Sequence, residues 1–177
     1  MDQIDFQKEL IERCKTGDRK AQYNLYRMYS KGMYNICLRM LPSTMEAEDV
    51  LQESFMDVYR MLHTYRYQST PGAWIKRIIV NNCINKLRKK KIHFEEIEEG
   101  RHLVEKEVEL KDNSIDVKAI KDALHNLSDG YRAVFSLYAI EGYDHQEIAE
   151  ILNISVSTSK SQYSRARKKI KETILNN

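Results

Sequence analysis

The sequence contains few of the residues that break regular structure. It has 6 glycines and 2 prolines among 177 residues, whereas the two residue types together make up about 12% of an average protein. So few breakers exclude the many tight turns of a β-sandwich or β-barrel, and they also exclude collagen-like and low-complexity chains. Because hydrophobic residues still make up 42% of the chain, the composition predicts a folded, all-α protein.

Long apolar runs and cysteine pairs are also missing. The longest uninterrupted apolar run is Leu137 to Ile140, far short of the roughly 18 residues that a transmembrane helix needs. The N-terminal residues MDQIDFQKEL have neither the basic nor the apolar segment of a secretory signal. Cys14, Cys37 and Cys83 form no C-x-x-C motif, which favours buried, reduced thiols over disulfides or a zinc site. We therefore expect a cytoplasmic protein with no membrane insertion.

Signatures of enzyme chemistry are absent from the sequence. The histidines do not have metal-ligand spacing, and neither a Gly-rich phosphate loop nor a G-x-S-x-G motif occurs. These histidines are His63, His93, His102, His125 and His145. We therefore expect no catalysis, no cofactor, no metal ion and no small-molecule substrate.

The formal net charge of +3 is small, but the charges are unevenly distributed. Residues 76–91 contain seven bases and no acid, residues 95–116 contain nine acids, and residues 160–171 contain six bases and no acid. Each run could simply be a solvated helix face. Two basic segments on either side of an acidic connector instead favour two separate contacts with one polyanion, such as nucleic acid.

Apolar periodicity and capping residues, among them Asp18, Ser43 and Asp144, predict helices along most of the chain. We expect them at about residues 3–15, 19–40, 44–62, 71–90, 115–126, 129–140, 145–152 and 156–174. Residues 92–116, with Gly100 as their only breaker, are expected to form an acidic linker. The chain should therefore consist of two small helical domains, at 1–91 and 117–177, joined by this linker at 92–116.

The predicted helix 44–62 has two faces of different character. Leu51, Phe55 and Val58 recur at helical spacing and should face the core. The roughly opposite side carries only acids, namely Glu46, Asp49, Glu53 and Asp57. These acids could form an ordinary exposed face. Because like charges at i,i+4 destabilise an isolated helix by a few tenths of a kcal/mol per pair, docking on a basic protein surface is the alternative.

One stripe of the predicted helix 71–90 combines an aromatic ring, two amides and two guanidinium groups. Its members are Trp74, Arg77, Asn81, Asn85 and Arg88, which fall within about 80° of each other on a helical wheel. Amides hydrogen-bond base edges, arginines contact phosphates and aromatic rings stack on unpaired bases. Tyr65, Arg66 and Tyr67 add aromatic rings and charge just upstream. The alternative is that Trp74 packs between helices and the rest is solvated surface.

The last two predicted helices have the pattern of a helix-turn-helix. Asn153 follows the first of them, where a tight turn needs a positive φ, and Ser155 caps the second. In this motif the second helix enters the major groove of DNA. Its outward side should hold Ser157, Lys160, Ser161, Ser164, Arg165 and Lys168, and its inward side Tyr163, Ala166, Ile170 and Ile174. A plain helical hairpin is the alternative.

Four segments of the chain resemble sigma factors, in the order in which that family carries them. Residues 46–55 (EAEDVLQESF) resemble the polymerase-binding helix, and residues 74–81 (WIKRIIVN) resemble the promoter-melting helix. Residues 127–132 and 147–166 are similar to the C-terminal helix-turn-helix domain. Since no third domain intervenes, the resemblance is to the extracytoplasmic-function (ECF) group of the sigma-70 family. An ordinary helix-turn-helix regulator that binds duplex DNA as a dimer is the alternative.

The resemblance implies a role for each group of residues and a set of partners. Asp49, Gln52 and Glu53 would bind the clamp helices of the polymerase β′ subunit. Binding to the −10 element would involve Tyr65, Arg66, Trp74, Arg77, Asn81, Asn85 and Arg88. Reading of the −35 element would involve Ser157, Thr158, Lys160, Ser161 and Arg165. The implied partners are the RNA polymerase core, through its β′ clamp helices and β flap, promoter DNA, and an anti-sigma factor.

The sequence also departs from the family pattern. Asn85 stands where an Asp is frequent, and Tyr67 and Pro71 replace small or aromatic residues in the loop before Trp74. Because the resemblance implies that this loop selects a flipped −10 base, the base preference cannot be carried over. Ser159 replaces a usual valine in the recognition helix, which weakens the expected packing of that helix.

Overall fold

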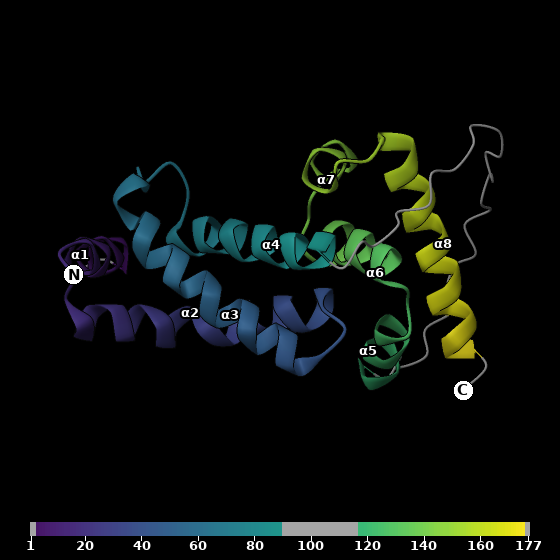
Figure 1. Ribbon diagram of the computed structural model, residues 1–177, viewed down its shortest axis with the longest axis horizontal. Coiled ribbons are helices and arrows are strands. Elements are labelled where there is room, and N and C mark those ends of the chain that lie inside the picture. The colour runs from purple at the N-terminus through teal and green to yellow at the C-terminus, as the bar shows by residue number, and fades with distance from the viewer. Residues whose placement is uncertain (1–2, 90–116, 176–177) are drawn as a thin grey trace. The chain divides into compact units, whose positions relative to one another are not determined.

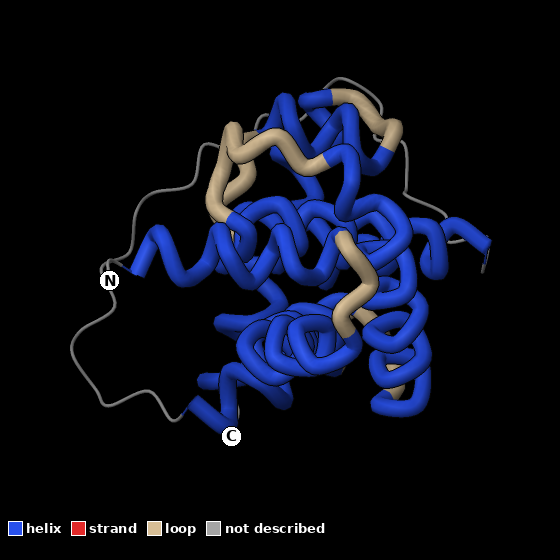
Figure 2. Tube along the Cα trace, turned by 90° about the vertical axis from the view of Figure 1, so that its left-hand side faces the viewer, coloured by secondary structure: helices blue, strands red, loops and turns tan. Residues whose placement is uncertain are grey.

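The computed structural model describes residues 3–89 and 117–175, and all their regular elements are helices (Figures 1 and 2). The chain divides into two compact units, Met1–Lys91 and Ile92–Asn177. The acidic linker predicted at 92–116 lies outside the described residues. None of the described helices is both long and apolar enough to cross a bilayer. The prediction of an all-α fold is confirmed.

The first unit is a bundle in which α2, α3 and α4 pack on one another and α1 packs on α2 (Figure 1). Its elements are α1 (Gln3–Lys15), α2 (Arg19–Met40), α3 (Thr44–Met61), a 3-10 turn (Leu62–Thr64) and α4 (Pro71–Lys89). The predicted caps are confirmed, because Asp18 accepts hydrogen bonds from the backbone of Lys20 and Ala21, and Ser43 accepts one from Glu46. These short-range caps fix where the helices begin.

The core of the first unit lies between α2, α3 and α4. Leu51, Phe55 and Val58 of α3 are buried as predicted, and α4 buries an apolar side that includes Val80 and Ile84. Two structural features bring α2 and α4 close together. The buried thiols of Cys37 and Cys83 lie 3.8 Å apart, and a Cβ added at Gly72 would lie 3.0 Å from Cε1 of Tyr29. All three cysteines are buried, and none is part of a disulfide, as predicted.

The second unit is organised around its last helix, α8. Its elements are α5 (Val117–His125), α6 (Asp129–Phe135), a π-helical turn (Ser136–Ile140), α7 (His145–Leu152) and α8 (Val156–Leu175). The chain is helical over the whole predicted range 129–140, but its second half is π-helical and not α-helical. There the backbone widens to i→i+5 hydrogen bonds, and Glu141 N donates to Ser136 O at 3.0 Å.

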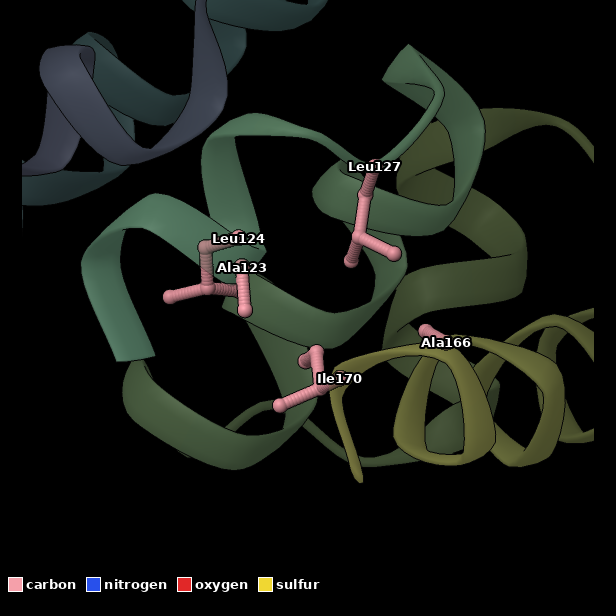
Figure 3. Packing of buried hydrophobic residues seen from close by; sticks show 5 residues of the cluster. All are labelled: Ala123, Leu124, Leu127, Ala166 and Ile170. Atoms are coloured by element: carbon pink, nitrogen blue, oxygen red, sulfur yellow. The ribbon is translucent and has the colours of Figure 1, made fainter. Parts of the chain in front are cut away.

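The core of the second unit joins α5 and the following turn to α8. Figure 3 shows the five buried side chains gathered there, which are Ala123, Leu124, Leu127, Ala166 and Ile170. The turn is secured by Arg132, which is 3% exposed. Its guanidinium donates to the carbonyl oxygens of His125 at 3.2 Å and Leu127 at 3.0 Å and pairs with Asp129. Arg132 therefore has a structural role.

Candidate nucleic-acid and polymerase interfaces

The exposed side of α3 carries the predicted polymerase-binding residues together with two methionines. Asp49, Gln52 and Glu53 are all exposed, and Met45 and Met56 are 70% and 61% exposed. These five residues are called the α3 face below. Their spacing of three and four places them on one side of the helix. Neither methionine was among the residues predicted for this surface, although the same helical spacing would have found both.

The acidic surface of α3 is narrower than the sequence predicted. Asp57 is half-buried, and it accepts a 2.9 Å hydrogen bond from Nδ2 of Asn82 and pairs with Arg60 at 3.3 Å. Asn82 also donates to Ser54 Oγ at 3.0 Å. Glu46 is half-buried at the start of the helix. Exposed acids therefore remain in the middle of α3, where Asp49 and Glu53 lie.

The predicted stripe on α4 lies at the surface of the first unit. Arg77, Asn81, Asn85 and Arg88 are exposed, and Trp74 is half-buried. Together these five residues are called the α4 stripe. Part of the Trp74 ring thus stays at the surface, which differs from the alternative of a core residue packed between helices. The stripe presents an aromatic surface, amides and cations along one face, as the spacing predicted.

Tyr65 does not fit its predicted role as a residue that binds DNA directly. Its side chain is 4% exposed, and its hydroxyl donates to the backbone oxygen of Ser69. The Tyr65 ring lies 5.2 Å from the Trp74 ring and 4.8 Å from the Tyr67 ring. Tyr65 is therefore the support beneath Trp74. Arg66, the next predicted residue, is exposed.

The loop before α4 has an unusual backbone conformation at Tyr67. Its φ of 60° lies in the left-handed region, which costs a residue other than glycine about 1–3 kcal/mol unless the surroundings favour it. Those surroundings are Glu12 and Lys15 of α1, which contact the Tyr67 side chain. No pattern in the sequence could have paired residues so far apart along the chain.

The exposed side of α8 carries most of the residues predicted to read duplex DNA. Ser157, Lys160 and Arg165 are exposed and Ser161 is half-buried. These four residues are called the α8 face. Thr158 is the exception, because it is 6% exposed and its hydroxyl bonds with Ser155 Oγ at 2.8 Å. The prediction that Thr158 contacts DNA is therefore wrong for this conformation, since its side chain completes the cap of the helix.

The turn between α7 and α8 has the geometry that the sequence predicted. Asn153 ends α7 in the left-handed conformation, with φ 55° and ψ 52°. Asp144 and Glu147 form a complete capping box at the other end of α7. Ser155 Oγ accepts a hydrogen bond from the backbone of Thr158 at 3.0 Å and so caps α8. These local signals fix the helix-turn-helix.

A polar contact joins α7 to α8 where the family pattern has an apolar one. Ser159 is fully buried, and its hydroxyl lies 2.9 Å from Nδ1 of His145. The His145 ring also stacks on Tyr138, with centroids 4.2 Å apart. Burial, aided by the positive charge of Lys160, lowers the pKa of His145 and outweighs Asp144, which acts in the opposite direction. The imidazole is thus favoured in its neutral form.

Metal ligands do not gather in the described residues. Within residues 3–89 and 117–175, no group of three or more His, Cys, Asp or Glu side chains is arranged to hold an ion. The predicted site residues lie instead on three surfaces: the α3 face, the α4 stripe and the α8 face.

Comparison with known proteins identifies the family. Residues 25–92 match "Sigma-70 region 2" and residues 118–170 match "Sigma-70, region 4". The ECF RNA polymerase sigma factor SigW of Bacillus subtilis is 30% identical over 179 residues, which cover 94% of this chain and 96% of SigW. This chain belongs to the ECF sigma factors of the sigma-70 family. It therefore acts in promoter recognition and transcription initiation.

Further relatives agree with this membership. The ECF RNA polymerase sigma-E factor of Haemophilus influenzae is 31% identical over 179 residues, which cover 93% of either chain. Among solved structures, the sigma factor RpoE of Bartonella quintana in complex with the anti-sigma factor NepR has a TM-score of 0.57 at 21% identity, covering 86% of this chain and 95% of that one. CnrH, in complex with the cytosolic domain of CnrY, has a TM-score of 0.55 at 19% identity, with coverages of 97% and 98%. These two structures share the fold.

Proposed function

We propose that the three surfaces divide the work of an ECF sigma factor. The α3 face binds core RNA polymerase, the α4 stripe holds the unpaired −10 strand, and the α8 face reads the −35 element as duplex. The observation that carries this proposal is the half-buried Trp74 ring, which continues into exposed amides and arginines along one side of α4. Such a surface suits unpaired bases, because an aromatic ring stacks on a base only where its face is accessible.

The α3 face has the composition of a protein interface. Its exposed methionines are flexible apolar side chains that adapt to a partner, and the acids between them add charge complementarity to a basic surface. Met45 and Met56 lie at either end of the segment that contains Asp49 and Glu53. We assign this face to the clamp helices of the polymerase β′ subunit, as the family resemblance implies.

The α4 stripe offers a separate contact for each part of an unpaired strand. The Trp74 ring provides the stacking platform, worth about 1–3 kcal/mol per stacked base. The amides of Asn81 and Asn85 can pair with exposed base edges, and the guanidinium groups of Arg77 and Arg88 can bind phosphates. Bases leave the duplex more readily when such contacts are available, so the stripe supports strand opening.

The α8 face supplies polar and cationic groups to the major groove. Lys160 and Arg165 are long enough to reach guanine edges or phosphates, and the hydroxyls of Ser157 and Ser161 can bond to either. Thr158 is not part of this face, because it is buried in the cap of the helix. The resemblance also implies that the second unit contacts the polymerase β flap.

In the proposed function, this chain supplies promoter specificity and does not catalyse a reaction. Catalysis belongs to the polymerase, so we expect no cofactor, metal ion or small-molecule substrate for this chain, and we expect it to act in the cytoplasm, where the polymerase is. We also infer regulation by an anti-sigma factor, because RpoE of Bartonella quintana, which shares the fold, was solved in complex with one.

Transcript mapping tests the proposed function directly. The protein is mixed with bacterial core polymerase and genomic DNA, and the start sites of the transcripts are sequenced. We expect start sites that share two elements at a constant spacing, and we expect core polymerase alone to give none of them. The competing function is that of a dimeric helix-turn-helix regulator. That function would be favoured if the free protein bound palindromic duplex DNA tightly and its addition to core polymerase gave no new transcription start sites.

A further inference from the structure

Three residues from two distant parts of the chain form one connected group beside the α4 stripe. The Tyr67 hydroxyl donates a hydrogen bond to the Glu12 carboxylate. Lys15 Nζ binds the same carboxylate at 2.9 Å and reaches the backbone oxygen of Tyr65 at 3.5 Å. It also lies 4.9 Å from the centre of the Tyr67 ring, within the range of a cation–π interaction. Glu12, Lys15 and Tyr67 are called the latch below.

The latch determines a loop conformation that the chain would not otherwise adopt. Tyr67 has a φ of 60°, and a bulky aromatic residue rarely enters the left-handed region without tertiary contacts. The hydrogen bonds and the cation–π contact from α1 are those contacts. The hydrogen bonds from Tyr67 and Lys15 lower the pKa of the Glu12 carboxyl group, which is the acceptor of both. The acceptor is therefore ionised at neutral pH.

The latch connects directly to the aromatic surface of the α4 stripe. The Tyr67 ring packs on Tyr65 at 4.8 Å, and the Tyr65 ring packs on Trp74 at 5.2 Å. Lys15 restrains the backbone of Tyr65 as well as the side chain of Tyr67. Because neighbouring rings in a packed series move together, the position of Tyr67 affects the tilt of the platform at Trp74.

The charges of the latch are compatible with a neighbouring polyanion. An isolated carboxylate beside a DNA-binding surface would repel phosphates. Here Lys15 neutralises Glu12, and Nζ of Lys8 lies 5.9 Å from the centre of the Tyr67 ring. The group therefore carries no excess negative charge and can lie next to an unpaired strand.

We propose that Glu12, Lys15 and Tyr67 are positioning residues for strand opening, and that through them α1 takes part in selecting the unpaired −10 base. This inference rests on the proposed function of the α4 stripe. The latch sets the conformation of the loop and the tilt of Trp74, and these two features define the surface that a flipped base meets. It gives the N-terminal helix a role in promoter choice.

The test uses holoenzymes of the full chain and a promoter library with a randomised −10 element. The variants are Tyr67→Phe, which removes the hydroxyl but keeps the ring, Glu12→Gln and Lys15→Met. Glu9→Gln is the matched control, because Glu9 is an exposed acid one turn earlier on α1. We expect each latch variant to reduce strand opening roughly three- to tenfold, the range of one lost hydrogen bond. The control should stay within about twofold of the wild type.

The base preference separates positioning from folding. Each promoter of the library carries a transcribed barcode that identifies its −10 element, so sequencing the transcripts gives the ratio of −10 bases used, and this ratio does not depend on how much of the protein is folded. We expect a changed ratio for Tyr67→Phe and Glu12→Gln, with core polymerase affinity unchanged. Both variants break the same hydrogen bond. Strand opening by the double variant, Tyr67→Phe with Glu12→Gln, should therefore be no lower than that of the more impaired single variant. The inference would be overturned if the ratio of −10 bases and the extent of strand opening were both unchanged. It would also be overturned if the ratio were unchanged while core binding, closed-complex binding and strand opening were all reduced equally.

A fourth variant distinguishes failure of the latch from failure of the proposed function. Trp74→Ala should impair opening whether or not the latch exists. If Trp74→Ala impairs opening and the latch variants do not, α1 has no role but the α4 stripe keeps its assignment. If none of the four variants affects opening, the assignment of the α4 stripe itself is wrong, and the inference about α1 is lost with it.

Discussion

The α4 stripe and the α8 face carry similar polar groups, but they are supported in different ways. Behind the α4 stripe lies a series of aromatic rings, from Trp74 through Tyr65 to Tyr67, and its outer member is held by α1. Local caps and the contact between Ser159 and His145 support the α8 face. The first surface thus depends on contacts between distant segments, whereas the second depends mostly on near neighbours.

This difference agrees with what we propose that each surface binds. Duplex DNA has a fixed groove, so a rigid helix with exposed polar side chains is sufficient to read it. An unpaired base has no fixed position, and the protein must provide the platform that fixes it. A platform made of a half-buried ring needs a second layer beneath it, and Tyr65 is that layer. The predictions below test whether the two surfaces really act separately.

The largest expected effect is common to both surfaces, because both need the polymerase. In the α3 face, Asp49→Lys combined with Glu53→Lys places like charges against a basic partner, which costs several kcal/mol of binding. Core polymerase affinity, measured by fluorescence anisotropy, should fall strongly, while the free energy of unfolding changes by no more than about 0.5 kcal/mol per site. Charge reversal at Asp122, an exposed acid on α5, is the control. If the double variant bound core polymerase with unchanged affinity, the assignment of the α3 face to polymerase binding would be wrong.

The next effect concerns the α4 stripe alone. Trp74→Ala removes the stacking platform and should weaken open-complex formation by about 1–3 kcal/mol per stacked base, with little change in closed-complex binding. Permanganate reactivity of thymines in the −10 element measures the opening. Tyr23→Ala, at an exposed aromatic residue of α2 that is 59% exposed, is the control. Equal loss of both steps would indicate a folding defect and return Trp74 to a packing role.

The corresponding change on the α8 face should have the opposite pattern. Arg165→Ala should weaken closed-complex binding by about 1–3 kcal/mol if the guanidinium reaches a base edge, and it should lower the salt dependence of binding by about one unit of slope if it binds a phosphate. Lys121→Ala, at an exposed base of α5, is the control. If Arg165→Ala left closed-complex binding normal but impaired open-complex formation, this result would contradict the separation of the two surfaces.

The smallest effect concerns the support of the α8 face. The pKa of His145 is lowered from its ordinary value of 6.5 in the folded protein, so the unfolded chain binds a proton more readily. This contribution to stability is therefore complete above pH 6.5 and is lost as the pH falls below it. Thermal denaturation of wild type and His145→Gln between neutral and mildly acidic pH should show a steeper fall for the wild type. Identical pH profiles would mean that His145 does not contribute.

Predictions from the sequence succeeded where the signal was local. The caps at Asp18 and Asp144 and the left-handed turn at Asn153 depend on residues within one helical turn, and the structure has all of them. The resemblance implied that Tyr65 and Thr158 bind DNA, but both residues are buried. Their burial comes from packing and capping partners that the helical period does not specify.

Long-range polar contacts were the other feature that the sequence could not predict. Asp57 belongs to the acidic series of α3 by its spacing, but its partner Asn82 lies on α4. Glu12 and Tyr67 are likewise on different elements, and neither residue type requires the other. Periodicity shows which side of a helix is apolar. It does not show which polar groups meet when two helices pack.

We propose that unpaired and duplex promoter DNA are bound by different surfaces of this chain. The most direct measurement is the affinity of each holoenzyme for a promoter with a pre-opened −10 element, relative to the same promoter as full duplex. We predict that the wild type prefers the pre-opened promoter, that Trp74→Ala loses most of this preference, and that Arg165→Ala keeps it while binding both promoters more weakly. Equal loss of the preference in both variants, or in neither, would contradict the claim.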